Sequence, residues 1–265
     1  MTQAHLRLLC ANDVYKADKF AVMRAMKPMY QGRGVTKCVI PGDFVGGSLF
    51  ASKHMGESMI RVANAVGFDY ATLGNHEFDF GEDRLEELMD ISEFPWLGSN
   101  IRYASSGELF HSVLDTDVFE VPVEGCVGEG IQPVKVGVFG VCTQATPNLA
   151  SCTGKAKFEN VIKHSKRCTE YLRNVHHCDI VLALTHVSLA IDKDIAESVP
   201  GIDVILGGHD HDPFLLMHRT FHTPYHLFCP SATCYLPFSA FPYAVRYDDD
   251  ISFSVYVASQ MERLL

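Results

Sequence analysis

Residues 69–79 read Asp-Tyr-Ala-Thr-Leu-Gly-Asn-His-Glu-Phe-Asp, a short apolar strand that runs directly into a polar loop. Two later segments repeat this pattern, since Asp179-Ile-Val-Leu-Ala-Leu-Thr precedes His186 and Asp203-Val-Ile-Leu-Gly-Gly precedes His209. The carboxyl ends of parallel strands lie along one edge of a sheet, where loops on a rigid scaffold form binding sites. The repeat therefore predicts that these polar loops meet at one such edge.

Strand and helix signals alternate outward from these segments, the pattern of a mostly parallel sheet with helices on its faces. Short apolar runs are typical of strands covered on both faces, and they predict strands at residues 6–11, 38–41, 70–73, 96–99, 135–141, 180–184 and 204–206. Helical periodicity predicts helices at residues 20–29, 54–66, 83–91, 161–175 and 191–198. The expected fold class is therefore α/β.

Two stretches depart from this alternation. Residues 102–132 are rich in Gly and Ser, and they predict a loop or hairpin excursion with strands near Val113 and Phe119. After Pro213, short β-rich pieces broken by prolines, the last at residues 251–257, predict antiparallel strands that close one side of the fold. No low-complexity linker interrupts the sequence, so we expect residues 1–265 to form a single domain.

Composition limits the classes of function. The chain has 265 residues, 47% of them hydrophobic and 20% charged, which is typical of a globular protein and excludes a disordered or fibrous chain. Its 32 acidic and 22 basic residues give a net charge of −10, which disfavours binding to a nucleic-acid polymer. Small phosphorylated ligands remain compatible with this charge if metal ions reverse the local field.

The sequence also predicts a location. No apolar run approaches the roughly 18–20 residues that span a bilayer, so we expect no transmembrane helix and no membrane partner. The apolar segment near the N-terminus is too short for a secretory signal. Nine cysteines, odd in number and never spaced Cys-x-x-Cys, are typical of reduced thiols. These features together predict a cytoplasmic protein.

Candidate ligands lie in five loops that follow predicted strands: Asn12-Asp13-Val14-Tyr15, Pro41-Gly42-Asp43, Gly74-Asn-His-Glu-Phe-Asp79, Thr185-His186 and Gly207-Gly-His-Asp-His211. Taken singly, Gly208-His-Asp-His211 is compatible with a tight turn that carries surface histidines, and Asn75-His76 with an ordinary turn. Together, their carboxylates, imidazoles and amide suit Zn, Mn, Fe or Co better than Ca, which prefers oxygen ligands alone. One carboxylate can bridge two metal ions about 4 Å apart, and Asp43 is the candidate bridge.

The order of these motifs resembles that of the calcineurin-like metallophosphoesterases. Within that superfamily, Leu73-Gly-Asn-His-Glu-Phe-Asp79 and Gly207-Gly-His-Asp-His211 are most similar to the 5′-nucleotidase family, and the resemblance runs from about residue 6 to residue 211. It implies a four-layer α/β/β/α sandwich of mixed, mostly parallel sheets. It also implies two metal ions at the strand ends, divalent or mixed-valence, drawn from Mn, Zn, Fe and Co.

The resemblance further implies which residues bind each metal ion. The first ion would be bound by Asp13, Asp43 and His211. The second would be bound by Asp43, Asn75, His186 and His209. Asp43 would thus bridge the two ions, as the loop chemistry also suggests.

A catalytic pair, His76 and Asp79, follows from the same resemblance, which also places Asn75 and His76 against the substrate. A hydroxide held by the metal ions would attack phosphorus in line. His76, oriented by Asp79, would stabilise the transition state or protonate the leaving oxygen. Considered alone, Asp79 is equally compatible with a helix cap before Gly81.

Tyr15 departs from the family pattern, which has histidine at this position in an Asp-x-His motif. A phenol, with an ordinary pKa of about 10, ligates well only when a strong Lewis acid such as Fe(III) ionises it. Tyr15 is therefore either a metal ligand or an aromatic residue packed beside the site. We favour the packed role, because packing is the commoner use of tyrosine.

The C-terminal domain that binds the nucleoside in larger relatives is expected to be absent, because the chain ends at Leu265. We expect core or subunit contacts, rather than the alternative of a base-stacking wall, for the aromatic residues Phe221, Tyr225, Phe228, Tyr235, Phe238, Phe241 and Tyr243. We expect a dinuclear metal hydrolase of phosphate monoesters, with nucleoside 5′-monophosphates or similar small molecules as substrates. The alternative is a catalytically weakened metal-binding or scaffold protein. The sequence does not predict the oligomeric state.

Overall fold

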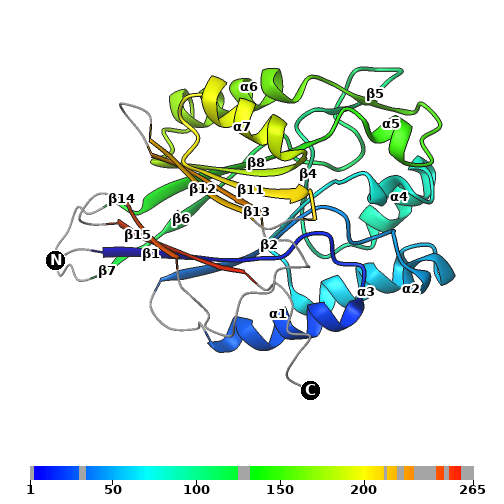
Figure 1. The fold of residues 1–265 in the computed structure, drawn as a ribbon, viewed down its shortest axis with the longest axis horizontal. Helices are drawn as coiled ribbons and strands as arrows, with labels where there is room; N and C mark the ends of the chain where they lie inside the picture. Colours follow the sequence, from blue (N-terminus) through cyan, green and yellow to red (C-terminus); the bar gives the residue numbers. More distant parts are fainter. Residues whose placement is uncertain are drawn as a thin grey trace.

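The computed structural model describes residues 3–29, 34–124, 132–211, 214–219, 224–229, 243–247 and 251–257. Two β-sheets lie face to face at its centre (Figure 1). The first has the strand order β14 (Tyr243–Tyr247), β15 (Ile251–Val257), β1 (Gln3–Cys10), β2 (Val35–Pro41), β3 (Tyr70–Thr72) and β4 (Trp96–Leu97), and β7 (Val123–Glu124) pairs with β1. The second has the order β12 (Phe214–Arg219), β13 (Pro224–Cys229), β11 (Val204–His209), β10 (Ile180–Val187), β8 (Val134–Cys142) and β6 (Asp117–Val121).

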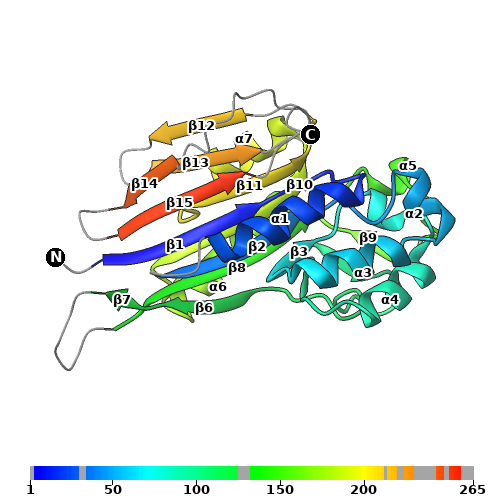
Figure 2. The same ribbon diagram turned by 90° about the horizontal axis from the view of Figure 1, so that it is seen from below.

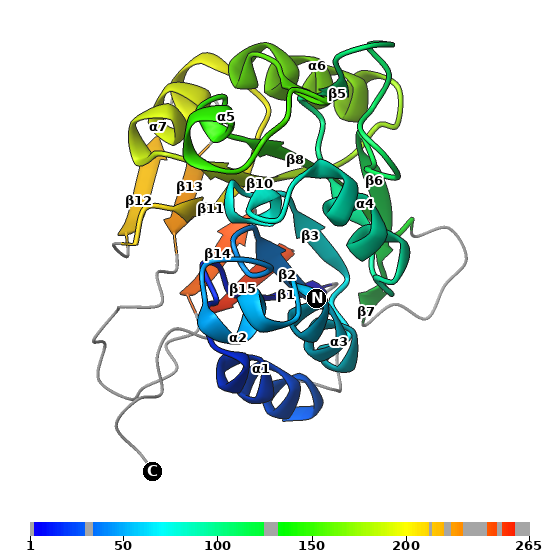
Figure 3. The same cartoon turned by 90° about the vertical axis from the view of Figure 1, so that its right-hand side faces the viewer.

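Helices cover the outer face of each sheet, as Figure 3 shows. The first sheet is covered by α1 (Ala17–Met29) and α3 (Glu57–Val66), and the second by α6 (Val161–Asn174) and α7 (Leu189–Ser198). The shorter elements α2 (Leu49–Lys53), η1 (His76–Phe78), α4 (Glu82–Asp90) and α5 (Thr146–Leu149) lie at one end of the sheets. The predicted four-layer α/β/β/α sandwich is therefore confirmed.

The central strands are apolar on both faces because each face packs against a different layer. In β10, Leu182 and Leu184 belong to the core between the two sheets. The alternate residues Val181 and Ala183 belong to the core beneath α6 and α7. Successive side chains of a strand point to opposite faces, so one apolar run serves both cores.

The two C-terminal hairpins each extend one of the sheets. Strands β12 and β13 are antiparallel, and so are β14 and β15, as the sequence predicted. However, β13 pairs in parallel with β11, and β15 pairs in parallel with β1. Figure 2 shows β15 (red) alongside β1 (blue). The hairpins therefore widen both sheets rather than close a single side.

The helix predicted at residues 54–66 was wrong at its start. Helix α2 ends at Lys53, and α3 begins only at Glu57. Gly56 between them has a φ of 84°, a left-handed conformation that interrupts an α-helix. The helix predicted at residues 161–175 agrees closely with α6, where the Asn160 side chain caps the first turn by accepting a hydrogen bond from the Lys163 N–H at 2.8 Å.

The excursion at residues 102–132 was predicted only in part. Phe119 lies in β6 as expected, but Val113 lies outside any strand, and β7 provides the second strand instead. A small two-stranded sheet of β5 (Ile101–Tyr103) and β9 (Ala156–Phe158) was not predicted. Strand β6 pairs with β8 and β7 with β1, so this excursion contributes to both large sheets.

Two expectations about the chain can be compared with the described segments. Within them, no helix has both the length and the apolar character required to cross a membrane. None of the cysteines described with side chains forms a disulfide bond: Cys10, Cys38, Cys142, Cys152, Cys168 and Cys178.

Candidate metal centre

The predicted ligand loops meet where the central strands of both sheets end. Asp13 follows β1, Asp43 follows β2, and the loop with Asn75 and His76 follows β3. The second sheet contributes from β10 and β11, whose parallel register places His186 opposite Gly208 and Val187 opposite His209. The polar groups from both sheets therefore meet at one end of the sandwich.

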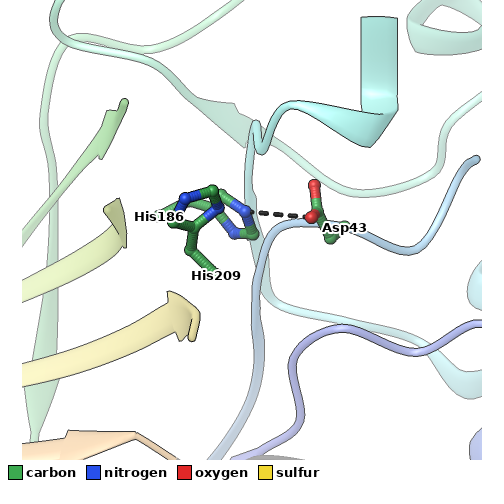
Figure 4. A group of neighbouring side chains, drawn as sticks. All are labelled: Asp43, His186 and His209. Atoms are coloured by element: carbon green, nitrogen blue, oxygen red, sulfur yellow. Dashed lines mark ion pairs between the residues drawn. The ribbon is translucent and has the colours of Figure 1, made fainter. Parts of the chain in front are cut away.

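Asp43, His186 and His209 form the centre of the site (Figure 4). One ligand atom of each lies within 4.8 Å of the others. His186 Nε2 is 3.1 Å from Asp43 Oδ2, and the two imidazole rings have centroids 5.1 Å apart. This spacing allows all three residues to bind one metal ion.

His186 is oriented by a backbone contact on its other nitrogen. Its Nδ1–H donates a hydrogen bond to the Pro41 carbonyl at 2.8 Å, which directs Nε2 towards Asp43. Nε2 is buried and has no hydrogen-bond partner among the described residues. Metal-binding histidines use such a contact to fix the tautomer and the ring orientation.

Asn75 adds an amide to this cluster. Its Oδ1 accepts a hydrogen bond from His209 Nδ1–H at 3.0 Å. The structure therefore brings together the four residues that the resemblance assigned to the second metal ion.

Asp13 and His211 form an adjacent cluster with Tyr15. Asp13 Oδ1 lies 3.4 Å from His211 Nε2, and the Tyr15 hydroxyl lies 3.2 Å from the same nitrogen. Asp13 Oδ1 is buried and has no hydrogen-bond partner in the described part of the chain. Asp13 Oδ2, in contrast, accepts hydrogen bonds from the Asn12 side chain and from the His209 N–H, the latter at 3.1 Å.

Tyr15 makes packing contacts through its ring in addition to the polar contact of its hydroxyl with His211. It meets the His76 ring edge to face, with centroids 5.7 Å apart. It also lies against Gly47, where a Cβ atom would come within 2.4 Å of the ring. Burial and the nearby carboxylates, Asp43 first among them, hold the pKa of Tyr15 above its usual value. The phenol is therefore neutral in this environment.

The backbone is strained at three of the candidate ligands. Asp13, Asp43 and His209 have φ values of 52°, 55° and 82°, in the left-handed region that non-glycine residues rarely adopt. Each such residue costs about 1–3 kcal/mol, and this kind of strain clusters at functional sites. Gly74 allows the close approach of two loops, since a Cβ atom there would lie 2.3 Å from Asp43 Oδ1.

His76 and Asp79 form the pair that the sequence predicted. His76 Nδ1 lies 2.8 Å from Asp79 Oδ2, and the same oxygen accepts a hydrogen bond from the Gly47 N–H at 3.1 Å. Asp79 does not have the alternative role of capping α4. Gly81 is the N-cap of α4, and Asp79 ends η1 instead.

The pKa values of the histidines and of Asp43 at the site are set by the charged groups next to them. Burial lowers the pKa of His186, but the charge of Asp43, whose Oδ2 lies 3.1 Å from Nε2, prevails and raises that pKa to about 10. The hydrogen bond to Asp79 is the largest cause of the rise in the pKa of His76 to about 9. Burial acts to raise the pKa of Asp43, yet His186 outweighs it and brings that pKa below its usual value. A proton on His186 therefore balances the charge of Asp43.

Glu77 was missed as a functional residue, although it lies within the quoted motif. Its fully buried carboxylate accepts hydrogen bonds from four backbone N–H groups: Asp43 at 2.8 Å, Phe44 at 2.8 Å, Val45 at 3.1 Å and Gly74 at 2.6 Å. Glu77 thus joins the loop after β2 to the loop after β3. The sequence signal that could have identified Glu77 is its position, because it is an ionisable residue between His76 and Phe78.

The side chains of the aromatic residues between positions 221 and 243 lie outside the described residues, so their expected role in core or subunit contacts stays a prediction.

Comparison with known proteins agrees with this geometry. Residues 6–213 match the family model described as calcineurin-like phosphoesterase. The chain is 31% identical over 173 residues to human 5′-nucleotidase, covering 64% of this chain and 28% of that protein. It is 26% identical over 191 residues to the trifunctional nucleotide phosphoesterase protein YfkN of Bacillus subtilis, covering 64% of this chain and 13% of that protein. The chain thus spans less than a third of the length of these relatives.

Solved structures show the same fold. The NAD nucleotidase of Haemophilus influenzae matches with a TM-score of 0.71 at 21% identity, covering 87% of this chain and 45% of that chain. A calcineurin-like phosphoesterase structure of YfkN from Bacillus subtilis matches with a TM-score of 0.64 at 20% identity, covering 87% of this chain and 81% of that chain.

Proposed function

The chain belongs to the calcineurin-like phosphoesterase family, and from that premise we propose that it hydrolyses phosphate monoesters of nucleotides at a two-metal centre. The observation that carries the proposal is the convergence of Asp43, His186 and His209, with their ligand atoms within 4.8 Å of one another. Asn75 and the His76–Asp79 pair adjoin this cluster.

Membership of the family implies divalent metal ions, and the residues present fit them. Asp13 Oδ1 and His186 Nε2 are buried atoms with no hydrogen bond to any described residue, as expected of metal ligands. The mixture of carboxylate, imidazole and amide donors suits Zn, Mn, Fe or Co. We assign one ion to Asp13, Asp43 and His211 and the other to Asp43, Asn75, His186 and His209.

Bound metal ions would supply Lewis-acid stabilisation of the phosphoryl group and activation of water. The residues of the chain supply the proton. Asp79 holds His76 through Nδ1, which leaves Nε2 as the nitrogen available to a substrate. The hydrogen bond to Asp79 raises the pKa of His76 and so favours the protonated imidazole, which can protonate the leaving oxygen.

Nucleoside 5′-monophosphates are the proposed substrates, since the relatives named above include 5′-nucleotidases. The net charge of −10 disfavours polymeric nucleic acids, so a small substrate held through its phosphoryl group fits better. The alternative is a protein that keeps the metal-binding fold but turns over slowly. It is favoured by one observation, the tyrosine at position 15 beside His211.

Phosphate release tests the proposal directly. The metal-free protein is loaded in turn with Mn, Zn, Co or Fe and supplied with AMP, other nucleoside monophosphates and an aryl phosphate. We expect release that depends on the metal and is lost in Asp43→Ala. Metal uptake without release of phosphate from any of these substrates would instead support the weakened scaffold.

A further inference from the structure

We propose that Asn12 is a positioning residue that holds one carboxylate oxygen of Asp13 and so leaves the other free to bind a metal ion. This inference rests on the proposed function, in which Asp13 contributes to the first metal site. Asn12 belongs to neither the proposed ligand set nor the proposed catalytic pair.

The two oxygens of Asp13 have different surroundings. Oδ2 accepts two hydrogen bonds, one from Nδ2 of Asn12 and one from the His209 N–H at 3.1 Å. Oδ1 accepts none from the described residues, although it is buried and lies 3.4 Å from His211 Nε2. The two donors therefore fix the carboxylate with Oδ1 directed at the first metal site.

The side chain of Asn12 is buried and forms a hydrogen bond with Asp13 through its amide nitrogen. Its side chain is buried, with 1% of its surface exposed, and its Oδ1 has no hydrogen-bond partner within the described segments. Burying an amide with its oxygen unpaired costs free energy that an apolar side chain would avoid. Its contact with Asp13 therefore accounts for an amide at this position.

Asn12 also lies where the first sheet and the second sheet come close to each other at the site. Asn12 follows β1 of the first sheet, and its Cβ lies 3.4 Å from the position that a Cβ on Gly208 in β11 would take. The second donor to Asp13 Oδ2, the His209 N–H, belongs to that same strand. Asn12 and β11 thus hold Asp13 from two sides, and Asp13 needs this support because its φ of 52° is strained.

Metal titration of variants tests the proposal. Isothermal titration of the metal-free protein with Mn gives the two site affinities, and Asp13→Ala identifies which of them belongs to the first site. We expect Asn12→Ala and Asn12→Asp, which both lack the donor, to weaken the first site about 10–100-fold, the usual effect of losing a residue that orients a ligand. The second site should keep its affinity, which also shows that each variant is folded.

Two further variants separate positioning from general stability. Asn12→Ser keeps a hydrogen-bond donor, so its first-site affinity should lie between those of the parent and Asn12→Ala. Asn100 is a matched control, because it is another buried asparagine. Its side-chain amide donates hydrogen bonds to the backbone carbonyls of Cys142 and Glu159, which are not proposed ligands. Asn100→Ala should lower the Tm and leave both metal affinities unchanged.

Three results would overturn the inference. If Asn12→Ala and Asn12→Asp both bind the first ion as tightly as the parent, Asn12 does not position Asp13. If Asn12→Asp binds that ion more tightly, position 12 acts as a ligand site. A parent protein that takes up no metal ion overturns the proposed function and this inference with it, whereas the first two results leave the proposed function standing.

Discussion

His76 and Asp79 are joined through Nδ1 and Oδ2, which lie 2.8 Å apart, and the Gly47 N–H donates to the same carboxylate oxygen. Asp79 therefore does two things at once: it fixes the imidazole ring, and it stabilises the protonated form. The remaining nitrogen of His76 is then presented with a proton, as a general acid requires.

The first prediction concerns this pair in the metal-free protein. NMR titration of His76 should give a pKa of about 9, so the imidazolium predominates at neutral pH and is lost as the pH rises through that value. Asp79→Asn should lower the pKa towards the ordinary value of about 6.5, because the hydrogen bond to Asp79 is the largest cause of the rise. An unchanged pKa in Asp79→Asn would show that the pair does not set the ionisation of His76.

The second prediction separates chemistry from metal binding. His76→Ala should lower kcat by about 10²–10⁴ without changing the metal content, because the imidazole acts on the leaving group rather than on a metal ion. Asp43→Ala should lose both ions, and its Tm in the presence of metal should fall, because bound ions stabilise the folded state by mass action. Steady-state kinetics and metal analysis of the two variants are the measurements. A fully active His76→Ala protein contradicts the assigned role.

The third prediction concerns Tyr15. The first metal site, which has tyrosine where the family has histidine, should bind Zn or Mn more weakly than the second. Tyr15→His should tighten that site, because a neutral imidazole ligates these ions without the ionisation that a phenol needs.

Titration of both sites in the parent and in Tyr15→His provides the measurement, and equal, tight binding at both parent sites contradicts the prediction. A visible tyrosinate band in the Fe(III)-loaded parent that disappears in Tyr15→Phe would show that Tyr15 is a ligand.

The fourth prediction concerns the buried carboxylate of Glu77. In Glu77→Gln an amide N–H₂ replaces one acceptor oxygen, which costs about 1–3 kcal/mol for each buried N–H left unpaired. The Tm should fall, and metal affinity should fall too, because the loop that carries Asp43 loses its support.

Glu82 offers a matched control for this effect. It is also buried, and its carboxylate accepts backbone N–H groups of residues 153–156, which are not proposed ligands. Glu82→Gln should lower the Tm in the same way and leave metal affinity unchanged. If both variants lose metal equally, the loss reflects global stability rather than the Asp43 loop.

The fifth prediction concerns substrate breadth. If recognition comes mainly from the phosphoryl group, kcat/KM should differ by less than about 100-fold between nucleoside monophosphates and an aryl phosphate, since one or two pocket contacts are worth about 1–3 kcal/mol. Steady-state kinetics with a panel of substrates measure this. A preference of about 10⁴-fold or more for one nucleotide would require a base pocket within the chain.

The ligand loops could be predicted from sequence because the required information is local. An apolar strand followed by glycine and a polar residue is a contiguous pattern, and it identified the loops with Asp43, His76 and His209. Helix α6 could be predicted as well, because its buried residues His164, Cys168 and Leu172 follow a helical repeat.

The features that were not predicted from the sequence depend on the local backbone conformation or on contacts between residues far apart in the chain. The break at Gly56 depends on a left-handed φ, and the small sheet of β5 and β9 pairs Ile101 with Phe158. Glu77 became visible as a support only when the loop after β2 was placed against it. Hydrogen bonds across such separations leave no periodic trace in the sequence.

The candidate metal centre has ligands from both sheets, with Asp43 from the first and His186 and His209 from the second. Their separation is therefore set by the thickness of the apolar layer between the sheets, where Leu182 and Val138 lie. Protein interiors are close-packed and resist compression, and an ångström of misplacement can cost about 10²-fold in rate. Selection for turnover would then act also on apolar residues that contact neither metal nor substrate. Natural variation at these buried positions should therefore conserve side-chain volume as strictly as variation in the loops conserves the ligand side chains.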